Sequence, residues 1–149
     1  MINTHASVND CKLIDLPKIH NRAGNITPVE NNEDIPFEIK RIFYLYDMPG
    51  GESRGGHAHK ELYQLIIAAS GSFEVSLNDG KEYRRFFLNH PYYGLLIQPG
   101  IWAELVNFSS GSICLVLTSD IYSESDYLRN YQNYLDYLRS GTGNKKAKL

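Results

Sequence analysis

The chain has 149 residues, of which 42% are hydrophobic and 12% aromatic, enough for one compact hydrophobic core. Its 15 basic and 17 acidic side chains leave a net charge of −2, so there is no broad cationic surface for nucleic acid or acidic membranes. We expect one globular domain over residues 1–139, a flexible tail over residues 140–149, and neither a nucleic-acid nor a membrane partner.

No targeting segment stands out. The N-terminal stretch MINTHASVNDCKLID has neither the basic start nor the apolar run of a signal peptide. The longest apolar runs, residues 65–69 and 92–97, are far shorter than the roughly 20 residues of a membrane-spanning helix. We therefore expect a cytoplasmic protein in a reducing compartment, where Cys11 and Cys114 stay unpaired.

Short segments rich in β-branched and aromatic residues follow one another between turn signals, which is typical of an all-β protein. They cover residues 40–47, 62–69, 72–78, 81–88, 93–97, 103–108 and 112–118. Asn78, Asp79 and Gly80 predict a tight hairpin, because Gly80 accepts a positive φ and the other two tolerate left-handed conformations. Adjacent strands around this turn should be antiparallel.

The end of the chain predicts one amphipathic helix. Apolar and aromatic residues recur there at three- and four-residue intervals, behind Ser123 and Asp126, which resemble a capping pair. They are Tyr127, Leu128, Tyr131, Tyr134, Leu135 and Leu138. Many short strands followed by one helix favour a double-sheet jelly roll or a small barrel, with a cavity between the sheets.

The strongest candidate site lies in the Gly-rich residues 51–59, interpreted as a loop that leads into a strand. It holds His57 and His59, whose side chains share one face if the chain is extended, and the nearby Arg54. Imidazole accepts and returns protons near neutral pH, so a same-face pair favours a functional over a structural role. The other three histidines are expected in solvated loops: His5, His20 and His90.

This segment resembles the first motif of the cupins. The resemblance rests on the spacing of Gly51, His57, His59, Gln64 and Gly71. A looser resemblance to the second cupin motif covers residues 98–107. Metal-binding cupins have Glu and His where this chain has Gln64 and Ala103, so we expect no metal and no other cofactor.

Within the cupins, residues 21–137 resemble the sugar-nucleotide 3,4-ketoisomerases that act on TDP-4-keto-6-deoxyglucose. Four stretches carry the resemblance in the same order: residues 35–41, 54–60, 99–102 and 125–131. The resemblance implies a cupin-type double-sheet jelly roll with one C-terminal α-helix. It also implies a metal-free isomerase of bacterial deoxysugar biosynthesis, including that of lipopolysaccharide O-antigen, with a TDP-linked 4-keto-6-deoxyhexose as substrate.

The resemblance implies His57, His59, Tyr44 and Arg54 as catalytic residues. Moving a ketone from C4 to C3 removes the C3 proton, delivers one to C4 and passes through an enediol, without a redox cofactor. One imidazole would act as carbon acid or base while the other orients it or protonates oxygen, and the sequence leaves the assignment open. Tyr44 would donate its hydroxyl to the substrate, and Arg54 would stabilise enolate charge or bind a substrate oxygen. The implied substrate-binding residues are Arg41, Lys60, Gln64, Trp102, Ala103 and Arg22.

Two departures from the family pattern enlarge the expected pocket. Members commonly have His or Arg directly after the Trp, where this chain has Ala103, and a polar or aromatic residue where it has Ala23. Both leave the paired histidines intact. The C4 configuration of the product therefore stays open.

Two alternatives remain: a related sugar-nucleotide epimerase or other cupin enzyme, and a noncatalytic sugar-binding cupin. An epimerase should use a His assisted by a carboxylate, whereas Asp and Glu are absent from the motif positions nearest His57 and His59. Strand-like and loop-like pieces before Ile42 can exchange with a partner to cover sheet edges. We therefore expect a homodimer with an exchanged N-terminal segment.

Overall fold

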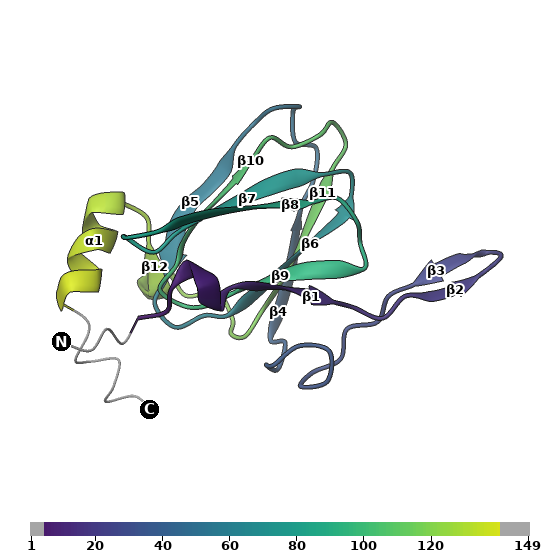
Figure 1. The fold of residues 1–149 in the computed structure, drawn as a ribbon, viewed down its shortest axis with the longest axis horizontal. Helices are drawn as coiled ribbons and strands as arrows, with labels where there is room; N and C mark the ends of the chain where they lie inside the picture. Colours follow the sequence, from purple (N-terminus) through teal and green to yellow (C-terminus); the bar gives the residue numbers. More distant parts are fainter. Residues whose placement is uncertain (1–4, 141–149) are drawn as a thin grey trace.

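The computed structural model describes residues 5–140. Within that range two five-stranded antiparallel sheets pack face to face (Figure 1), which confirms the predicted double-sheet jelly roll. None of the helices described there is long and apolar enough to span a membrane. Of the predicted tail, residues 141–149 lie outside the described residues, and Ser140 ends the C-terminal helix rather than starting the tail.

The sheets are built mostly from the expected segments. The first runs in the order β1 (Lys12–Asp15), β9 (Tyr93–Ile97), β6 (Gln64–Ser70), β11 (Ile113–Thr118), β4 (Arg41–Leu45). The second runs β12 (Tyr127–Leu128), β5 (Arg54–His59), β10 (Trp102–Val106), β7 (Phe73–Asn78), β8 (Tyr83–Leu88). Asn78 pairs with Tyr83 across the β7–β8 hairpin, and Gly80 has φ +89°, so that turn prediction is confirmed.

The strand β5 replaces the loop expected in the Gly-rich segment. Its pairing with β10 shifts by one residue, because Ala103 faces His57 while Leu105 faces Arg54. The extra residue is a β-bulge, and Gly55 has the positive φ of +84° that such a bulge requires. The glycines that resembled a loop in the sequence thus allow a bulged strand.

The C-terminal helix starts later than predicted. Tyr127 and Leu128 form β12 on β5, after the 3₁₀ turn η2 (Glu124–Asp126), and α1 covers Tyr131–Ser140. Asn130 caps the helix, since its Oδ1 accepts the Asn133 N–H at 3.0 Å, whereas Ser123 makes no side-chain cap bond. Tyr127 and Leu128 fit the helical periodicity of the sequence, but in the structure they pair with β5 as a strand instead.

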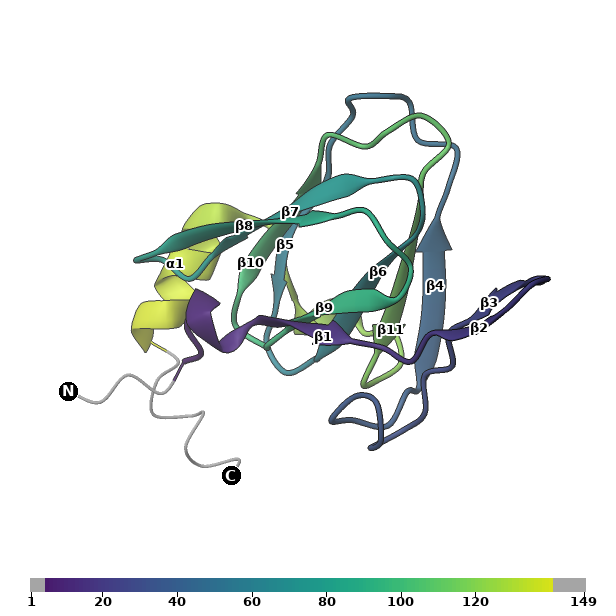
Figure 2. The same ribbon diagram turned by 45° about the vertical axis from the view of Figure 1, so that its right-hand side comes forward.

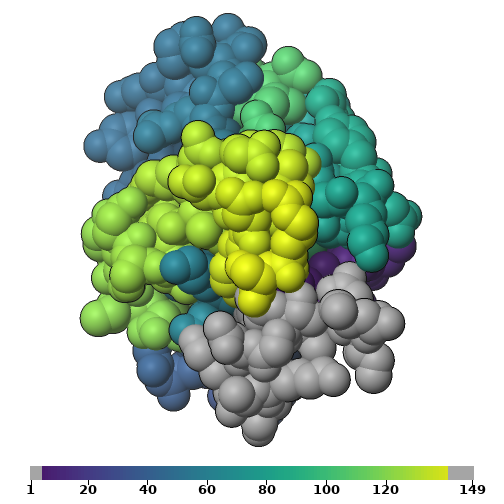
Figure 3. All heavy atoms as spheres, turned by 90° about the vertical axis from the view of Figure 1, so that its left-hand side faces the viewer, coloured from purple at the N-terminus to yellow at the C-terminus, as the bar shows by residue number. Residues whose placement is uncertain are grey.

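Helix α1 covers the outer face of the second sheet, at the end of the molecule that faces the viewer in Figure 3. Tyr134 is fully buried there, and its hydroxyl bonds to the carbonyl oxygens of Gly100 at 2.8 Å and Asn78 at 3.1 Å. The single hydroxyl proton is shared between these two acceptors, and this hydrogen bonding offsets the cost of burying the hydroxyl. These contacts attach the helix to the end of β7 and to the turn that precedes β10.

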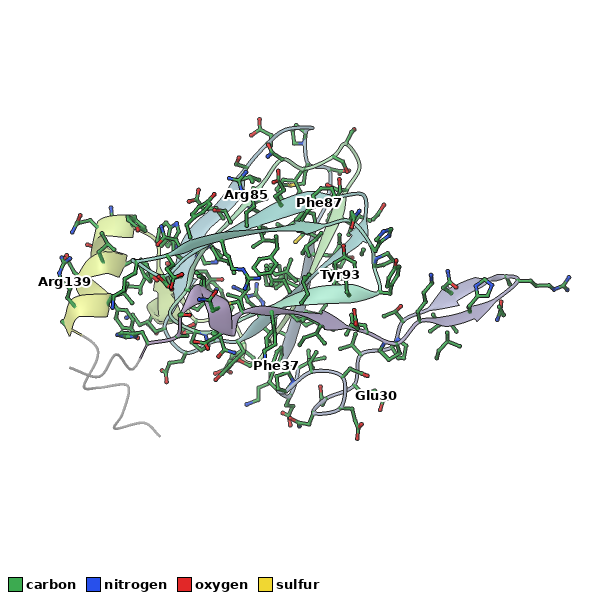
Figure 4. The ribbon with its side chains drawn as sticks, in the orientation of Figure 1. Glu30, Phe37, Arg85, Phe87, Tyr93 and Arg139 are labelled. Atoms are coloured by element: carbon green, nitrogen blue, oxygen red, sulfur yellow. The ribbon has the colours of Figure 1, made fainter. Side chains whose placement is uncertain are left out.

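The main core fills the space between the two sheets. Phe73 and Phe108 pack there with ring centroids 5.2 Å apart, and Cys11 and Cys114 are buried and unpaired, as expected. Burial raises the pKa of the Cys11 thiol to about 11, so it stays protonated. A second cluster, which includes Phe37 (labelled in Figure 4), covers the outer face of the first sheet.

The N-terminal part begins with the 3₁₀ turn η1 (Val8–Asp10) and leads through β1 to a separate hairpin. That hairpin is formed by β2 (Ile19–Asn21) and β3 (Gly24–Ile26), and it projects from the body of the molecule (Figures 1 and 2). Ile19 and Ile26 are 54% and 62% exposed. Exposed isoleucines on a projecting hairpin indicate a surface that is not covered within one chain.

Candidate functional site

A cavity of about 270 Å³ opens between the two sheets. Apolar side chains from four strands form part of its wall: Phe43, Leu45, Ile66, Leu105 and Val116. The polar side chains at the cavity are Arg54, His57, Gln64, Tyr127 and Arg129. An apolar pocket with a few convergent polar groups is the usual form of a small-molecule site.

The hollow follows from small side chains at inward positions. Gly55 and Ala103 line the cavity on neighbouring strands β5 and β10. The structure thus places four of the predicted site residues at one cavity: Arg54, His57, Gln64 and Ala103.

The two histidines lie side by side, as their spacing predicted. Their ring centroids are 4.9 Å apart and the rings are perpendicular. His57 lines the cavity, whereas His59 is only 6% exposed and lies behind it. The pair therefore has one imidazole at the cavity and one in the wall.

The surroundings of His57 lower the pKa of its imidazole. Burial, followed by the neighbouring His59 and the positive charge of Arg129, lowers its pKa from 6.5 to about 4. The ring is therefore neutral at pH 7, and a neutral imidazole can take a proton from a substrate carbon.

A carboxylate lies behind the histidines. Nδ1 of His59 is 3.0 Å from Oδ2 of Asp126, whose Oδ1 accepts the N–H of Glu61 at 2.8 Å. Partial burial would raise the pKa of Asp126, but the hydrogen bonds from His59 and the backbone keep it below its usual value. Asp and Glu are absent from the motif positions nearest the histidines, but β12 pairs with β5 and brings Asp126 to His59 across 67 positions of sequence.

An aromatic and charged cluster lies beside the cavity and was missed by the sequence analysis. The Arg129 guanidinium lies 4.0 Å above the Tyr127 ring and donates to both oxygens of Glu124, at 2.7 and 3.0 Å. Hydrogen bonds from Arg129 and Tyr122 lower the pKa of Glu124 to about 2. The helical interpretation of residues 127–138 concealed this cluster, although the run from Tyr122 to Arg129 is rich in aromatic and charged residues.

Two of the predicted site residues point away from the cavity. Strand β4 directs Phe43 and Leu45 inward, so Tyr44 faces outward and is 58% exposed beside Tyr46. Trp102 likewise lies on the outer face of β10, where it packs on α1 through Tyr134. Neither the expected hydroxyl of Tyr44 nor the ring of Trp102 lines the cavity in this chain.

The remaining predicted residues lie around or beyond the cavity. Arg41 stacks on the cavity residue Phe43, with its guanidinium carbon 4.5 Å from the ring centroid. Lys60 lines a separate polar depression of about 240 Å³ that it shares with Asp126. Arg22 and Ala23 lie in the turn of the β2–β3 hairpin. That hairpin projects away from the two sheets of its own chain (Figure 2), and neither residue lines the cavity.

The donor set does not fit a catalytic metal of the kind that many cupins hold. Among residues 5–140, no three His, Cys, Asp or Glu side chains form a group suited to a metal ion. Gln64 is a poor substitute for a carboxylate, Ala103 supplies no donor atom, and Nδ1 of His59 already bonds to Asp126.

Comparisons with known proteins agree with this geometry. The family model described as FdtA: WxcM-like, C-terminal matches residues 9–139. A TDP-4-oxo-6-deoxy-alpha-D-glucose-3,4-oxoisomerase from Aneurinibacillus thermoaerophilus is 42% identical over 127 residues, which are 85% of this chain and 91% of that protein.

Solved structures extend the likeness to the fold. The sugar 3,4-ketoisomerase QdtA from Thermoanaerobacterium thermosaccharolyticum, in complex with TDP, is 38% identical with a TM-score of 0.87, over 91% of this chain and 98% of that one. The TDP-quinovose 3,4-ketoisomerase WlaRB from Campylobacter jejuni is 45% identical with a TM-score of 0.82, over 85% and 98%. The family match spans most of the chain and includes the cavity and both histidines, so this protein belongs to the WxcM-like, C-terminal family.

Proposed function

We propose that this chain is a sugar-nucleotide 3,4-ketoisomerase that converts TDP-4-keto-6-deoxyglucose into a TDP-3-keto-6-deoxyhexose. The observation that carries the proposal is a neutral His57 at a cavity wall, backed by His59 and Asp126. Relatives that are 38–45% identical over most of their length carry out, by their names, 3,4-ketoisomerisation of TDP-linked sugars. A place in bacterial deoxysugar biosynthesis and a cytoplasmic location stay predictions.

The reaction is a balanced transfer of protons. His57 removes the proton from C3, and the C4 carbonyl oxygen gains a proton, which gives an enediol. A proton is then delivered to C4 and the C3 hydroxyl proton leaves, so the ketone ends at C3 with no change in atoms or electrons. Because His57 lines the cavity and His59 does not, we assign the removal of the carbon proton to His57.

Positive and hydroxyl-bearing side chains at the cavity would stabilise the enediolate. Arg54 and Arg129 both line it, and a cation held close to a developing oxyanion lowers the barrier to its formation. Tyr127, rather than Tyr44, is the tyrosine that lines the cavity. Arg41, close to Phe43 and to the exposed Tyr122, is suited to the charged nucleotide part of the substrate.

We also propose that the protein is a homodimer with an exchanged N-terminal segment. The β2–β3 hairpin projects from the body, and the edge strand β4 carries Ile42 and Tyr44, followed by Tyr46, each between 58% and 61% exposed. A partner's hairpin would cover such an edge and its apolar surface. Light scattering should give roughly double the 17.0 kDa of one chain, and a monomer at working concentration would contradict the proposal.

A sugar-nucleotide epimerase is the second candidate, because the structure supplies the carboxylate-assisted histidine that such an enzyme would need. Incubation with TDP-4-keto-6-deoxyglucose in deuterated water, followed by NMR of the sugar, distinguishes the candidates. A ketone at C3 with deuterium at C4 supports the isomerase. A ketone that stays at C4, with deuterium at C3 or C5, supports the epimerase. Binding without exchange or turnover indicates a sugar-binding protein.

The same assay tests the absence of metal chemistry. Because the donor set does not fit a metal, we expect turnover to survive exhaustive chelation. Activity lost on chelation and restored by added metal would overturn this expectation.

A further inference from the structure

His59 is held in the wall of the cavity with little freedom to turn. Its ring is 4.9 Å from His57 and 4.3 Å from Tyr127, between ring centroids, and 6% of the residue is exposed. Its Nδ1 is paired with Asp126 at 3.0 Å. His59 thus lies directly behind the histidine that lines the cavity.

Asp126 is itself fixed. Its Oδ1 accepts the Glu61 N–H at 2.8 Å, its carbonyl oxygen accepts the Lys60 N–H at 2.9 Å, and its own N–H donates to the Ser123 carbonyl at 3.1 Å. These bonds leave Oδ2 aimed at His59. A partner held by three hydrogen bonds orients a buried imidazole more firmly than a free side chain would.

An ionised carboxylate accepts hydrogen bonds and donates none, so the proton of a neutral His59 must be on Nδ1. When His57 takes the substrate proton, a positive charge forms beside His59. The carboxylate of Asp126 lies directly behind His59 and offsets that charge.

We propose that Asp126 is a positioning residue that keeps the proton of His59 on Nδ1 and thereby lets the histidine pair carry the proton taken from the substrate. The proposal rests on the ketoisomerase function and names a residue for which the sequence suggested only a helix cap. Asp126 acts through His59 and does not line the cavity.

The test compares the wild type with Asp126→Asn. The amide can still accept the Glu61 N–H, but its NH₂ group would donate to His59 and shift the ring proton to Nε2. We expect kcat to fall by about 100-fold, the range for a disabled acid–base group, while KM changes by less than about threefold. Asp136→Asn is the matched control, because Asp136 lies on exposed α1, paired with Arg139, and should leave both constants unchanged.

Imidazole ¹⁵N NMR of the enzyme without substrate is the second measurement, and it reports which ring nitrogen of His59 carries the proton. If Asp126 had only a structural role, its substitution would not change this result. The wild type should show His59 protonated at Nδ1, and Asp126→Asn should show it protonated at Nε2. Either a wild-type His59 protonated at Nε2, or an Asp126→Asn enzyme with unchanged kcat, overturns the proposal. A fall in activity that comes only from a higher KM also overturns it.

Asp126→Glu keeps a carboxylate and covers the case in which Asp126→Asn fails to fold. It should keep the Nδ1 tautomer and retain more kcat than an enzyme with no carboxylate there, such as Asp126→Ala. Equal kcat for the Glu and Ala variants would contradict the positioning role. If the wild type itself does not turn over TDP-4-keto-6-deoxyglucose, the proposed function fails, while the NMR result still decides the link between Asp126 and His59.

Discussion

The space between the two sheets has a closed half and an open half. In the closed half, Phe73 and Phe108 pack ring against ring with at most 2% of either residue exposed. In the open half, Gly55 and Ala103 occupy inward positions, and His57, which packs against His59 and Tyr127, lines a cavity. The space between the two sheets thus contains both a packed core and a cavity. Large inward side chains fill the core, and small ones leave the cavity open.

This contrast separates stability from chemistry. Close-packed aromatic residues contribute burial and contact energy, but they cannot move protons. The open half gives up packing and gains room for a ligand. Substitutions in the closed half should therefore lower the free energy of unfolding, and substitutions in the open half should lower turnover.

Phe73→Ala should have the largest effect. Removing a fully buried ring leaves a cavity and should lower the free energy of unfolding by about 3–5 kcal/mol, measured by urea denaturation. Turnover per folded molecule should be unchanged. Phe87→Ala is the control, because Phe87 on the outer side of β8 is 56% exposed and should cost less than about 1 kcal/mol. Equal losses for the two variants would remove the distinction between the halves.

His57→Asn should lower kcat by roughly 100-fold or more, because a general acid–base group is lost from the cavity wall. Its free energy of unfolding should change little by comparison. His59→Asn should also lower kcat in this range, through the pairing with His57. His90→Asn, in a turn beside Tyr92, is the control. If both site variants keep turnover near that of the wild type, the paired-histidine mechanism is wrong.

The pH dependence should report the environment of His57. Its neutral form accepts the proton and its pKa is about 4, so kcat/KM should stay level between about pH 5.5 and 7.5 and fall tenfold per unit below the midpoint near 4. Arg129→Met removes a positive charge that lowers this pKa and should move the midpoint toward 6.5. An acid limb centred near 6.5 in the wild type would contradict the lowered pKa of His57.

Stability has to be followed across the same pH range. A folded-state pKa below the unfolded value of 6.5 means that the unfolded chain binds the extra proton first. The stability contribution of neutral His57 is therefore complete above about pH 6.5 and is lost as the pH falls toward 4. Circular dichroism at each pH separates this loss from protonation of the active enzyme.

Ala103→His should give the smallest effect, a few-fold change. The residue lines the open half without being able to transfer protons, so a larger side chain there should change the ratio of C4 epimers or KM more than it changes C3 exchange. NMR of the product and of deuterium incorporation measures both. An unchanged ratio and KM with strongly altered exchange would place position 103 in the proton-transfer machinery.

The sequence predicted features that depend on short-range patterns. Strand-forming segments, the Asn78–Gly80 turn and the shared face of His57 and His59 all follow from neighbouring residues. Asp126 could not be predicted as a partner of His59, since their contact depends on pairing between β12 and β5. Its local context, an acidic residue before an apolar run, indicated a helix cap instead.

The outward orientation of Tyr44 and Trp102 could not be predicted for another reason. Composition identifies a strand, but a shift of one residue exchanges its two faces, and only packing fixes which face is inward. Tyr44 and Phe43 are both aromatic neighbours on β4, and the cavity takes Phe43. The resemblance implied Trp102 as a substrate-binding residue, whereas its side chain packs against α1 on the outer face of the sheet.

The bulge at Gly55 has a consequence for how this site tolerates insertions and deletions. In a regular strand, residues three apart point to opposite sides, yet Arg54 and His57 both line the cavity. The extra residue between them brings both side chains to the same side of the strand. The two halves of β5 therefore differ in register by one residue. Deleting Gly55 would keep both Arg54 and His57 in the chain but would turn one of these two side chains away from the cavity.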